Sequence, residues 1–359
     1  MVSGGTSRGP DRLTQPHIPV MLAEVLERLA PADGETYIDA TFGAGGYASA
    51  ILDAADCKVV ALDRDPSAVT AGFQLALAYD GRLSLRQLPF SMLDHYTADP
   101  DADCETTYIA QFDGVVFDLG VSSMQLDQDD RGFSFQGDGP LDMRMFHDGG
   151  SVPPLEKGPS AADVVNTADA KLLADIIFQL GEEKRSRRIA EAIVARRAET
   201  PFARTLELAD LVEKVVGGRR GDPRHPATKT FQALRMYIND ELGELVRGLS
   251  GAERCLKPGG RLVVVTFHSL EDRIVKRFLA KRSGKDGGVS RHMPVQIESE
   301  TRPSLKIVNH PALTSSKGEL DVNPRARSAR LRSAVRTDAA PWPFDVADLG
   351  VPAIARRAL

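Results

Sequence analysis

The feature that most constrains this chain is a glycine-rich turn that directly follows a short strand pattern. Tyr37-Ile38-Asp39 ends the predicted strand, and the turn reads Thr41-Phe-Gly-Ala-Gly-Gly46. An apolar helix pattern follows, from Ala48 to Leu52. Glycines between a parallel strand and a helix let the backbone approach a ligand closely. The turn therefore favours a nucleotide-like ligand in an α/β fold, although a purely structural glycine turn would read the same way.

Strand and helix patterns alternate through the rest of the first third of the chain. A strand at 58–62 closes on Asp63, and Asp65-Pro66 is a helix start with a carboxylate cap and proline at the first helical position. A strand near 83–88 and an apolar run at 112–117 follow, and the run ends at Asp118. This alternation predicts a mostly parallel sheet with crossover helices.

The middle of the chain shows helix patterns only. The first begins at Asn166-Thr167, others cover 189–198 and 206–216, and Gly217-Gly218 ends the last. Strand patterns return at 261–267 and, more weakly, near 305–309 and 329–335. We expect an α/β domain interrupted by an all-helical domain. The predicted division is a disordered leader at 1–14, the α/β domain at 15–145 and 238–340, the inserted helical domain at 146–237, and a tail at 341–359.

The charges near the turn distinguish two cofactor classes. Gly43, Gly45 and Ala48 also satisfy the dinucleotide fingerprint, and Asp63 stands where an acid binds ribose hydroxyls. A dinucleotide would bring a doubly charged pyrophosphate close to Asp39 and Asp118. Two like charges about 4 Å apart at a partly wet site cost on the order of several kcal/mol. S-adenosylmethionine carries a sulfonium and an ammonium group instead, so the acids favour this methyl donor as cofactor.

Many short segments, in one order and up to about Arg336, resemble the bacterial 16S ribosomal RNA cytosine-N4 methyltransferases (the MraW or RsmH family). The resemblance implies a class I, Rossmann-like methyltransferase fold with a helical insertion. It also implies methylation of the exocyclic N4 amine of a decoding-centre cytidine in the assembled small subunit. The segments are His17-Ile-Pro-Val-Met21, Asp39-Ala-Thr-Phe-Gly-Ala-Gly-Gly46, Asp63-Arg-Asp-Pro66, Asp118-Leu-Gly-Val-Ser-Ser-Met-Gln125, Arg131-Gly-Phe-Ser-Phe135, Gly139-Pro-Leu-Asp-Met-Arg144, His225-Pro-Ala-Thr-Lys-Thr-Phe-Gln-Ala-Leu-Arg235, Thr266-Phe-His-Ser-Leu-Glu-Asp-Arg273 and Asn323-Pro-Arg-Ala-Arg-Ser328.

The resemblance also implies roles for individual residues. Gly45, Gly46 and Tyr47 would contact the methionine part of the cofactor, with Tyr47 acting through its backbone because many relatives have histidine there. Asp63 would bind the ribose hydroxyls, and Phe90 would lie against the adenine. Asp118 and Gln125 would complete the cofactor and reaction pocket. A core aromatic is the alternative reading of Phe90.

The chemistry requires a poorly nucleophilic amine to lie in line with the methyl group, so positioning dominates. Asp118 is the predicted catalytic residue, because its carboxylate can accept the hydrogens of the amine. The base must leave its stack, and Phe133 or Phe135 would hold it unless both are core residues. Ser269 and Asp272 resemble a capping box before the helix at 273–280, with His268 as a possible substrate contact. No histidine has metal-ligand spacing, so no metal is expected.

Composition limits the possible partners and the compartment. The net charge is −5, so an RNA partner requires locally basic surfaces. Three scattered cysteines, no secretory signal and no apolar run of the roughly 20 residues that span a bilayer predict a cytoplasmic protein without membrane contact. Homo-oligomerisation stays open. The candidate basic surfaces, otherwise simple solvated faces, are Lys184-Arg-Ser-Arg-Arg188 with Arg196-Arg197, the stretch from Arg219-Arg220 to Lys229, and Arg325, Arg327, Arg330, Arg332 and Arg336.

Three other functions stay open at this point. The first is a methyltransferase of the same fold that acts on another RNA, a protein or a small molecule. The second is a nicotinamide oxidoreductase, and the third is an RNA-binding assembly factor without catalysis. Binding of S-adenosylmethionine in preference to NAD would separate the methyltransferases from the oxidoreductase.

Overall fold

The computed structural model describes residues 19–94, 111–146, 158–217, 225–285, 302–347 and 349–356. The predicted leader at 1–14, His17 and Arg219-Arg220 lie outside these residues. None of the helices in the described ranges is long and apolar enough to cross a membrane.

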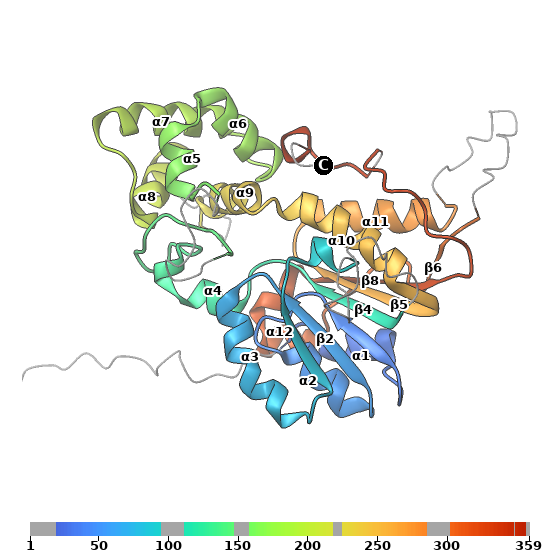
Figure 1. Cartoon of the computed structure of the whole chain (residues 1–359). Coiled ribbons are helices and arrows are strands. Elements are labelled where there is room, and N and C mark those ends of the chain that lie inside the picture. Colours follow the sequence, from blue (N-terminus) through green and yellow to red (C-terminus); the bar gives the residue numbers. More distant parts are fainter. Residues whose placement is uncertain are drawn as a thin grey trace, which may run out of the picture.

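One eight-stranded sheet forms the centre of the protein (Figure 1). Its strand order is β3-β2-β1-β4-β5-β8-β6, and β7 pairs with β8 beside this path. The first five strands in this order are parallel, whereas β8 runs antiparallel to β5, β6 and β7. The strands are β1 (Thr36–Asp39), β2 (Lys58–Asp63), β3 (Leu83–Gln87), β4 (Phe112–Asp118), β5 (Leu256–Thr266), β6 (Leu305–Ile307), β7 (Leu313–Thr314) and β8 (Arg330–Arg336).

Helices cover both faces of the sheet and also form a separate group. The helices are α1 (Leu22–Leu29), α2 (Gly46–Ala54), α3 (Pro66–Ala78), α4 (Ser123–Asp127), α5 (Ala161–Thr167), α6 (Ala170–Gln179), α7 (Ser186–Glu199), α8 (Thr205–Val216), α9 (Thr228–Ile238), α10 (Glu241–Cys255), α11 (Ser269–Arg282) and α12 (Lys317–Val322). Short 3₁₀ turns are η2 (Phe90–Met92), η3 (Asp129–Arg131), η5 (Pro324–Ser328) and η6 (Ala353–Ala355).

The sheet separates two buried apolar clusters, because successive side chains of a strand point to opposite faces. On β4, Val115 and Phe117 belong to the cluster with α10 and α11, whereas Val116 belongs to the cluster with α1 and α2. The central strands are therefore apolar on both faces, as expected for parallel strands covered by helices.

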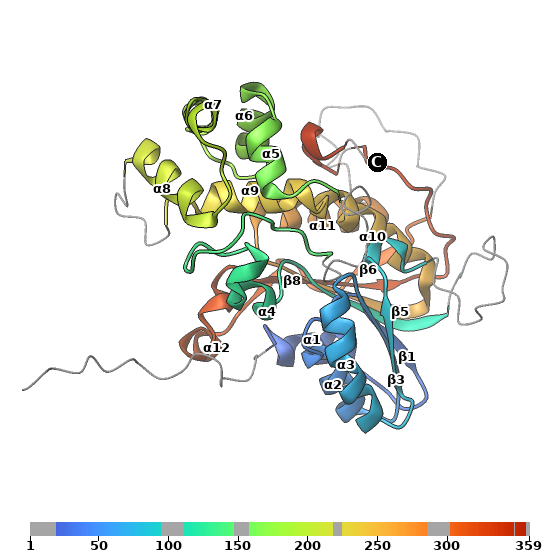
Figure 2. The same ribbon diagram turned by 60° about the vertical axis from the view of Figure 1, so that its left-hand side comes forward.

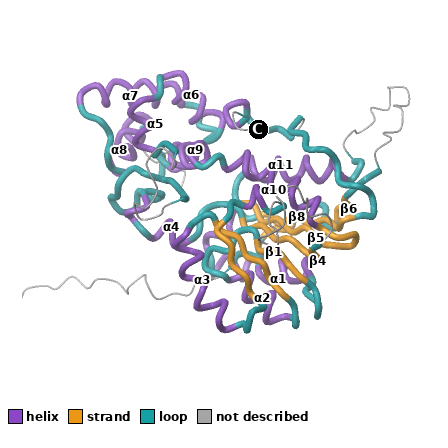
Figure 3. The backbone as a smooth tube through the Cα atoms, in the orientation of Figure 1, coloured by secondary structure: helices purple, strands orange, loops and turns teal. Residues whose placement is uncertain are grey.

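Helices α5 to α9 (161–238) form what we call the helical insertion, between β4 and α10 (Figure 2). Figure 3 shows the strands gathered in the sheet and this group built of helices and loops. The expected mostly parallel α/β fold with a helical insertion is confirmed. The residue bounds of the domains stay a prediction.

The first helices of the insertion correct one prediction. A helix starting at Asn166-Thr167 is wrong, because α5 ends at Thr167 and Asp169 then caps α6 by accepting from the backbone N–H of Leu172 (2.7 Å). The predicted end of α8 is confirmed at Gly217, which adopts a left-handed conformation.

The C-terminal segment, which gives no clear sequence signal, packs on both parts of the protein. Leu349 and Val351 are buried, and the backbone N–H of Ile354 donates to Gln179 Oε1 on α6 (3.2 Å). Lys281 on α11 pairs with Asp345 (2.8 Å). The segment thus connects α11 of the sheet layer to α6 of the helical insertion.

Candidate active site

A pocket of about 530 Å³ opens at the carboxyl ends of the parallel strands. This is the edge at which open α/β sheets bind ligands. Asp63 at the end of β2 and Asp118 at the end of β4 line it, and α9 of the helical insertion forms the opposite wall. One pocket therefore joins the glycine turn to the insertion.

Asp63 organises the glycine turn. Its Oδ2 accepts from the backbone N–H of Gly43 (2.8 Å), and its Oδ1 accepts from that of Asp65 (2.8 Å). Burial raises the pKa of the carboxyl, and these two hydrogen bonds oppose the rise. The residue predicted to bind ribose hydroxyls is thus held rigidly against the turn.

The three residues predicted for the methionine part of the cofactor lie at the start of α2. Gly46 and Tyr47 line the pocket, while Gly45 is absent from its wall and caps α2 with a φ of 80°. A Cβ at Gly45 would lie 2.5 Å from Leu75, so glycine is required there by packing. The Tyr47 hydroxyl donates to the carbonyl of Val20, which leaves the backbone as the part able to meet a ligand.

Phe90 lies in η2 at the pocket wall and packs edge-on against Phe117, with ring centroids 5.6 Å apart. A Cβ at Gly248 on α10 would lie 2.7 Å from Phe90 Cδ2. Glycine at this helical position therefore makes room for the ring. The ring is partly buried against the core and also lines the pocket, so its contact with the adenine stays a prediction.

Asp39 and Asp118 end adjacent parallel strands and form a desolvated acidic pair. Asp39 Oδ2 and Asp118 Oδ1 are buried without a hydrogen-bond partner in the described structure. Burial raises the pKa of Asp39 to about 7. The pKa of Asp118 lies well above its ordinary value, because the group is buried and because Asp39 and then Glu271 add like charge.

Only Asp118 of this pair lines the pocket; Asp39 lies behind it, with its Oδ1 accepting from the backbone N–H of Thr41 (3.1 Å). Buried carboxylates without partners need a proton or a cation. A positively charged ligand beside Asp118 would favour the ionised acids, which agrees with the expected S-adenosylmethionine.

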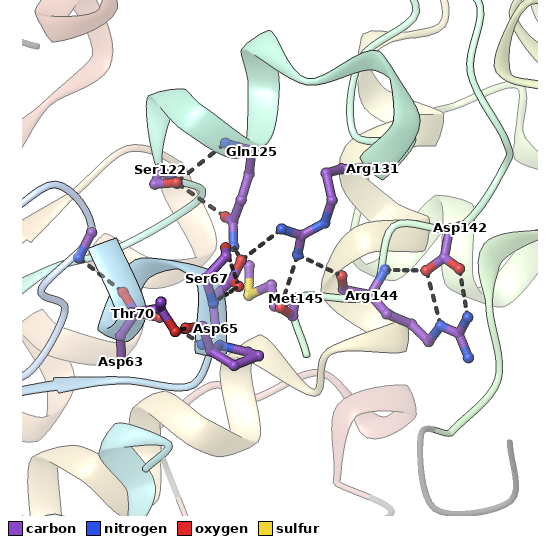
Figure 4. Close-up of polar contacts among 12 residues, drawn as sticks. Asp63, Asp65, Ser67, Thr70, Ser122, Gln125, Arg131, Asp142, Arg144 and Met145 are labelled. Carbon is purple, nitrogen blue, oxygen red and sulfur yellow. Dashed lines mark hydrogen bonds and ion pairs between the residues drawn. The ribbon is translucent and has the colours of Figure 1, made fainter. Parts of the chain in front are cut away.

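Gln125 also lines the pocket, but both ends of its amide have protein partners (Figure 4). Nε2 donates to Asp65 Oδ2 (3.0 Å), and Oε1 accepts from the backbone N–H of Ser122 (3.1 Å). The same Asp65 oxygen accepts from Arg131 (2.8 Å). Gln125 thus ties the loop after β4 to the start of α3, and direct contact with the cofactor stays a prediction for it.

The wall opposite the cofactor residues is aromatic. Phe133 is buried and has the Arg131 guanidinium 5.8 Å from its ring centroid. Phe135 is partly buried, and its ring centroid lies 4.7 Å from those of Phe231 on α9 and of His225. The two residues predicted to hold the base therefore belong to the pocket wall and to the core at once. Phe231 also lines the pocket. The sequence did not single it out, because only the packing of α9 places it beside Phe135.

The start of α11 requires a second correction. His268, the predicted substrate contact, lines the pocket, and that contact stays a prediction. His268 is the N-cap of α11: its Nδ1 accepts from the backbone N–H of Glu271 (3.4 Å), and its own backbone N–H donates to Glu271 Oε2 (3.3 Å). The predicted Ser269–Asp272 box is wrong because the helix starts earlier, at Ser269. Asp272 instead accepts two hydrogen bonds from Arg332 (2.7 and 3.0 Å).

A cluster of possible metal ligands lies beside the pocket. The donor atoms of Glu241, His268 and Glu271 lie within 4.8 Å of one another. Both carboxylate oxygens of Glu241 already accept from Arg235 (2.7 and 2.8 Å), and Glu271 caps α11. The carboxylates of the cluster therefore have partners within the protein. The expectation of no metal stays a prediction.

The predicted basic surfaces are only partly at the surface. Arg332 and Arg336 are buried, the former with Asp272 and the latter on the backbone carbonyl of Glu253 (2.9 Å), so including them in an RNA surface is wrong. The exposed cations from these stretches, within the described residues, are Lys184, Arg187, Arg188, Arg325, Arg327 and Arg330.

Comparison with known proteins agrees with this geometry. The model of the MraW methylase family matches residues 14–337. A protein of Hyphomonas neptunium named ribosomal RNA small subunit methyltransferase H is 57% identical over 90% of this chain and 89% of its own length. Proteins of that name from Parvibaculum lavamentivorans (55% identical; 94% and 95% of the two chains) and Rhizobium rhizogenes (51%; 98% and 97%) also match. Because the family model and these relatives span nearly the whole chain, the protein belongs to the MraW methylase family.

Proposed function

We propose that this enzyme methylates the exocyclic N4 amine of a decoding-centre cytidine in 16S ribosomal RNA, acting on the assembled small subunit. Family membership supports a methyltransferase that uses S-adenosylmethionine, and the names of the relatives support small-subunit ribosomal RNA as its substrate. The observation that carries the finer proposal is the place of Asp118. Asp118 lines a pocket that the predicted cofactor residues, Gly45 excepted, share with the aromatic wall.

The cofactor side of the pocket would hold the donor by charge and shape. Asp63 would accept hydrogen bonds from the ribose hydroxyls, Phe90 would cover the adenine, and the turn with Gly46 and the backbone of Tyr47 would contact the methionine part. When bound, S-adenosylmethionine supplies an activated methyl group on a sulfonium. Asp118 and Asp39 behind it would stabilise this positive charge in a site of low dielectric.

The opposite side would hold the flipped base. Phe133 and Phe135 would stack or flank the ring, in a pocket that excludes the neighbouring nucleotides. Asp118 would accept a hydrogen bond from the amine and so draw the nitrogen lone pair out of conjugation with the ring. The nitrogen would form its bond to the methyl carbon as the carbon–sulfur bond breaks, and it would then lose one proton to water. Alignment of the two partners would supply most of the rate enhancement.

Mass mapping of 16S ribosomal RNA from cells with and without the gene tests the proposal. We expect one methyl group on the base of a single decoding-centre cytidine to disappear without the gene. Purified enzyme and S-adenosylmethionine should restore it on small subunits from the deletion strain, and naked RNA should be a poor substrate. A methyl group on another nucleotide, or unchanged masses, would refute the proposed substrate.

A further inference from the structure

The chain crosses between the sheet layer and the helical insertion at two places that lie together. The outgoing crossing is the loop that leads up to Met145, in which Asp142 and Gly139 already bond to α5 and α8. The returning crossing is Asn239 with Asp240, between α9 and α10. Met143 and Asp240 have φ values of 63° and 50°, which non-glycine residues rarely adopt. Such conformations persist only where surrounding contacts hold them.

Asn239 joins the two crossings through one buried side-chain amide. Its Oδ1 accepts from the backbone N–H of Met145 (2.8 Å). Its Nδ2 donates to the carbonyls of Met143 (2.8 Å) and Arg235 (2.9 Å). Both hydrogens of the amide nitrogen are therefore used, and they hold the outgoing segment against the end of α9.

Arg131 joins the outgoing crossing to the turn at 63–66 between β2 and α3, which we call the cofactor turn because it holds the predicted ribose ligand (Figure 4). One guanidinium nitrogen donates to Asp65 Oδ2 (2.8 Å), and another donates to the carbonyls of Arg144 (3.3 Å) and Met145 (3.0 Å). Both side chains of the ion pair are at least nine-tenths buried. Asp65 is also the residue whose backbone N–H holds Asp63, the predicted ribose ligand.

Arg64 closes the network from the other side. Its guanidinium donates to the backbone carbonyl of Asn239 (3.0 Å). The two residues that follow Asp63 are therefore connected to both crossings, Arg64 directly to the returning one and Asp65 through Arg131 to the outgoing one. This ring of contacts links the cofactor turn to the insertion along one side of the pocket, where Arg64 and Met145 also line the wall.

We propose that Arg131 and Asn239 are positioning residues that fix the helical insertion relative to the cofactor turn. The insertion contributes Phe231 to the pocket wall, and the loop anchored by Arg131 contributes Phe133 and Phe135. The angle between the two parts thus sets the distance between the nucleotide wall and the methyl donor. A misplacement of about 1 Å can reduce a rate by about a hundredfold.

The first test measures the geometry itself and needs no RNA. Spin labels at Thr70→Cys on α3 and Lys171→Cys on α6 report the distance between the two parts, since both positions are exposed. Cys57 and Cys255 are buried, and Cys104, outside the described residues, is replaced by serine. We expect one narrow distance distribution in the labelled parent protein and a broader or shifted one in Asn239→Ala and in Arg131→Gln.

The control for this test is Arg302→Gln, which breaks the exposed ion pair between Arg302 and Asp338, two residues outside the network. It should leave the distribution unchanged. Unchanged distributions in both Asn239→Ala and Arg131→Gln would overturn the proposal. If Arg131→Gln does not fold, Asn239→Ala and the neutral pair described next decide the question.

The second test is kinetic and rests on the proposed function. With small subunits as substrate, Arg131→Gln should lower kcat by about a hundredfold, while the Kd for S-adenosylhomocysteine changes by less than about threefold. Asp65→Asn combined with Arg131→Gln replaces the ion pair by a neutral amide pair, and asparagine still caps α3. This double variant should recover at least about tenfold of the lost kcat and a narrow distance distribution.

The two tests separate the failure of each idea. A loss of cofactor affinity as large as the loss of kcat, or a double variant no better than Arg131→Gln, would show that Arg131 only maintains the fold. A parent enzyme that does not methylate small subunits would refute the proposed substrate, and the spin-label distances would still decide the positioning role.

Discussion

Asp39 and Asp118 end neighbouring parallel strands, and each keeps one buried carboxylate oxygen that no described group pairs with. Like charge from Asp39 contributes to the raised pKa of Asp118. Two buried acids in this arrangement are unfavourable when both are ionised. A sulfonium bound beside Asp118 would lower this cost, and the proposed function assigns this part to the cofactor.

Asp118→Asn removes the charge of this group while keeping its shape and an acceptor oxygen. We expect kcat to fall at least about a hundredfold, since the group that faces the developing charge is lost. The midpoint temperature of thermal unfolding should stay the same or rise slightly. The matched control is Asp113→Asn at the opposite end of β4, where Asp113 pairs with Lys257 (2.9 Å), and it should retain activity. Normal turnover by Asp118→Asn would remove this residue from the mechanism.

Cofactor affinity should depend on pH with a defined sign. Burial raises the pKa of Asp39 to about 7 in the empty protein, and a cation favours the ionised acids, so binding releases a proton near neutrality. Affinity for S-adenosylmethionine should therefore rise about tenfold between about pH 6 and pH 8. S-adenosylhomocysteine lacks the sulfonium charge, so its affinity, measured by calorimetric titration, should rise less over the same pH range. Equal slopes for both ligands would contradict this account.

Gly248→Ala should displace the ring of Phe90, because the new Cβ would lie 2.7 Å from Phe90 Cδ2 and 3.3 Å from Phe117 Cε1. Overpacking of this kind costs about 1–3 kcal/mol of stability. If Phe90 covers the adenine, the Kd for the cofactor should rise about tenfold. Gly318→Ala on α12 is the control, since a Cβ there meets nothing within 4 Å. A stability loss with unchanged Kd would make Phe90 a core residue alone.

The exposed arginines of α7 offer a test of RNA contact. Replacing Arg187 and Arg188 by glutamine removes two cations without disturbing the buried face of the helix. If both meet phosphates, the slope of log affinity against log salt for small-subunit binding should fall by about 1.5. Arg302→Gln should leave it unchanged. An unchanged slope in the α7 variant would place the RNA elsewhere.

The sequence predicts what local chemistry determines. The carboxylate cap at Asp65, the glycine end of α8 and the position of the acids after β1, β2 and β4 are all readable from short patterns, because strand ends and caps depend on neighbouring residues. The same alternation of strand and helix patterns predicts a mostly parallel sheet with crossover helices. The structure confirms each of these elements.

The remaining features depend on contacts between distant parts of the chain. Arg332 and Arg336 belong to an arginine-rich stretch that is typical of an exposed surface. The pairing of β8 nevertheless directs both side chains into the interior, where Arg332 pairs with Asp272 and Arg336 donates to the carbonyl of Glu253. His268 caps α11 through a ring nitrogen, a role that histidine seldom has. The network from Arg64 to Asn239 spans positions far apart in sequence, so no local pattern could have indicated it.

The central claim is that the acidic edge of the sheet holds a cationic methyl donor facing the aromatic wall. A crystal structure with S-adenosylmethionine tests it most directly. We expect the ribose hydroxyls on Asp63, the adenine against Phe90, and the methyl group directed past Asp118 toward Phe133 and Phe135. A donor bound outside this pocket, or a soaked dinucleotide seated with its diphosphate on the 43–46 turn, would contradict the claim.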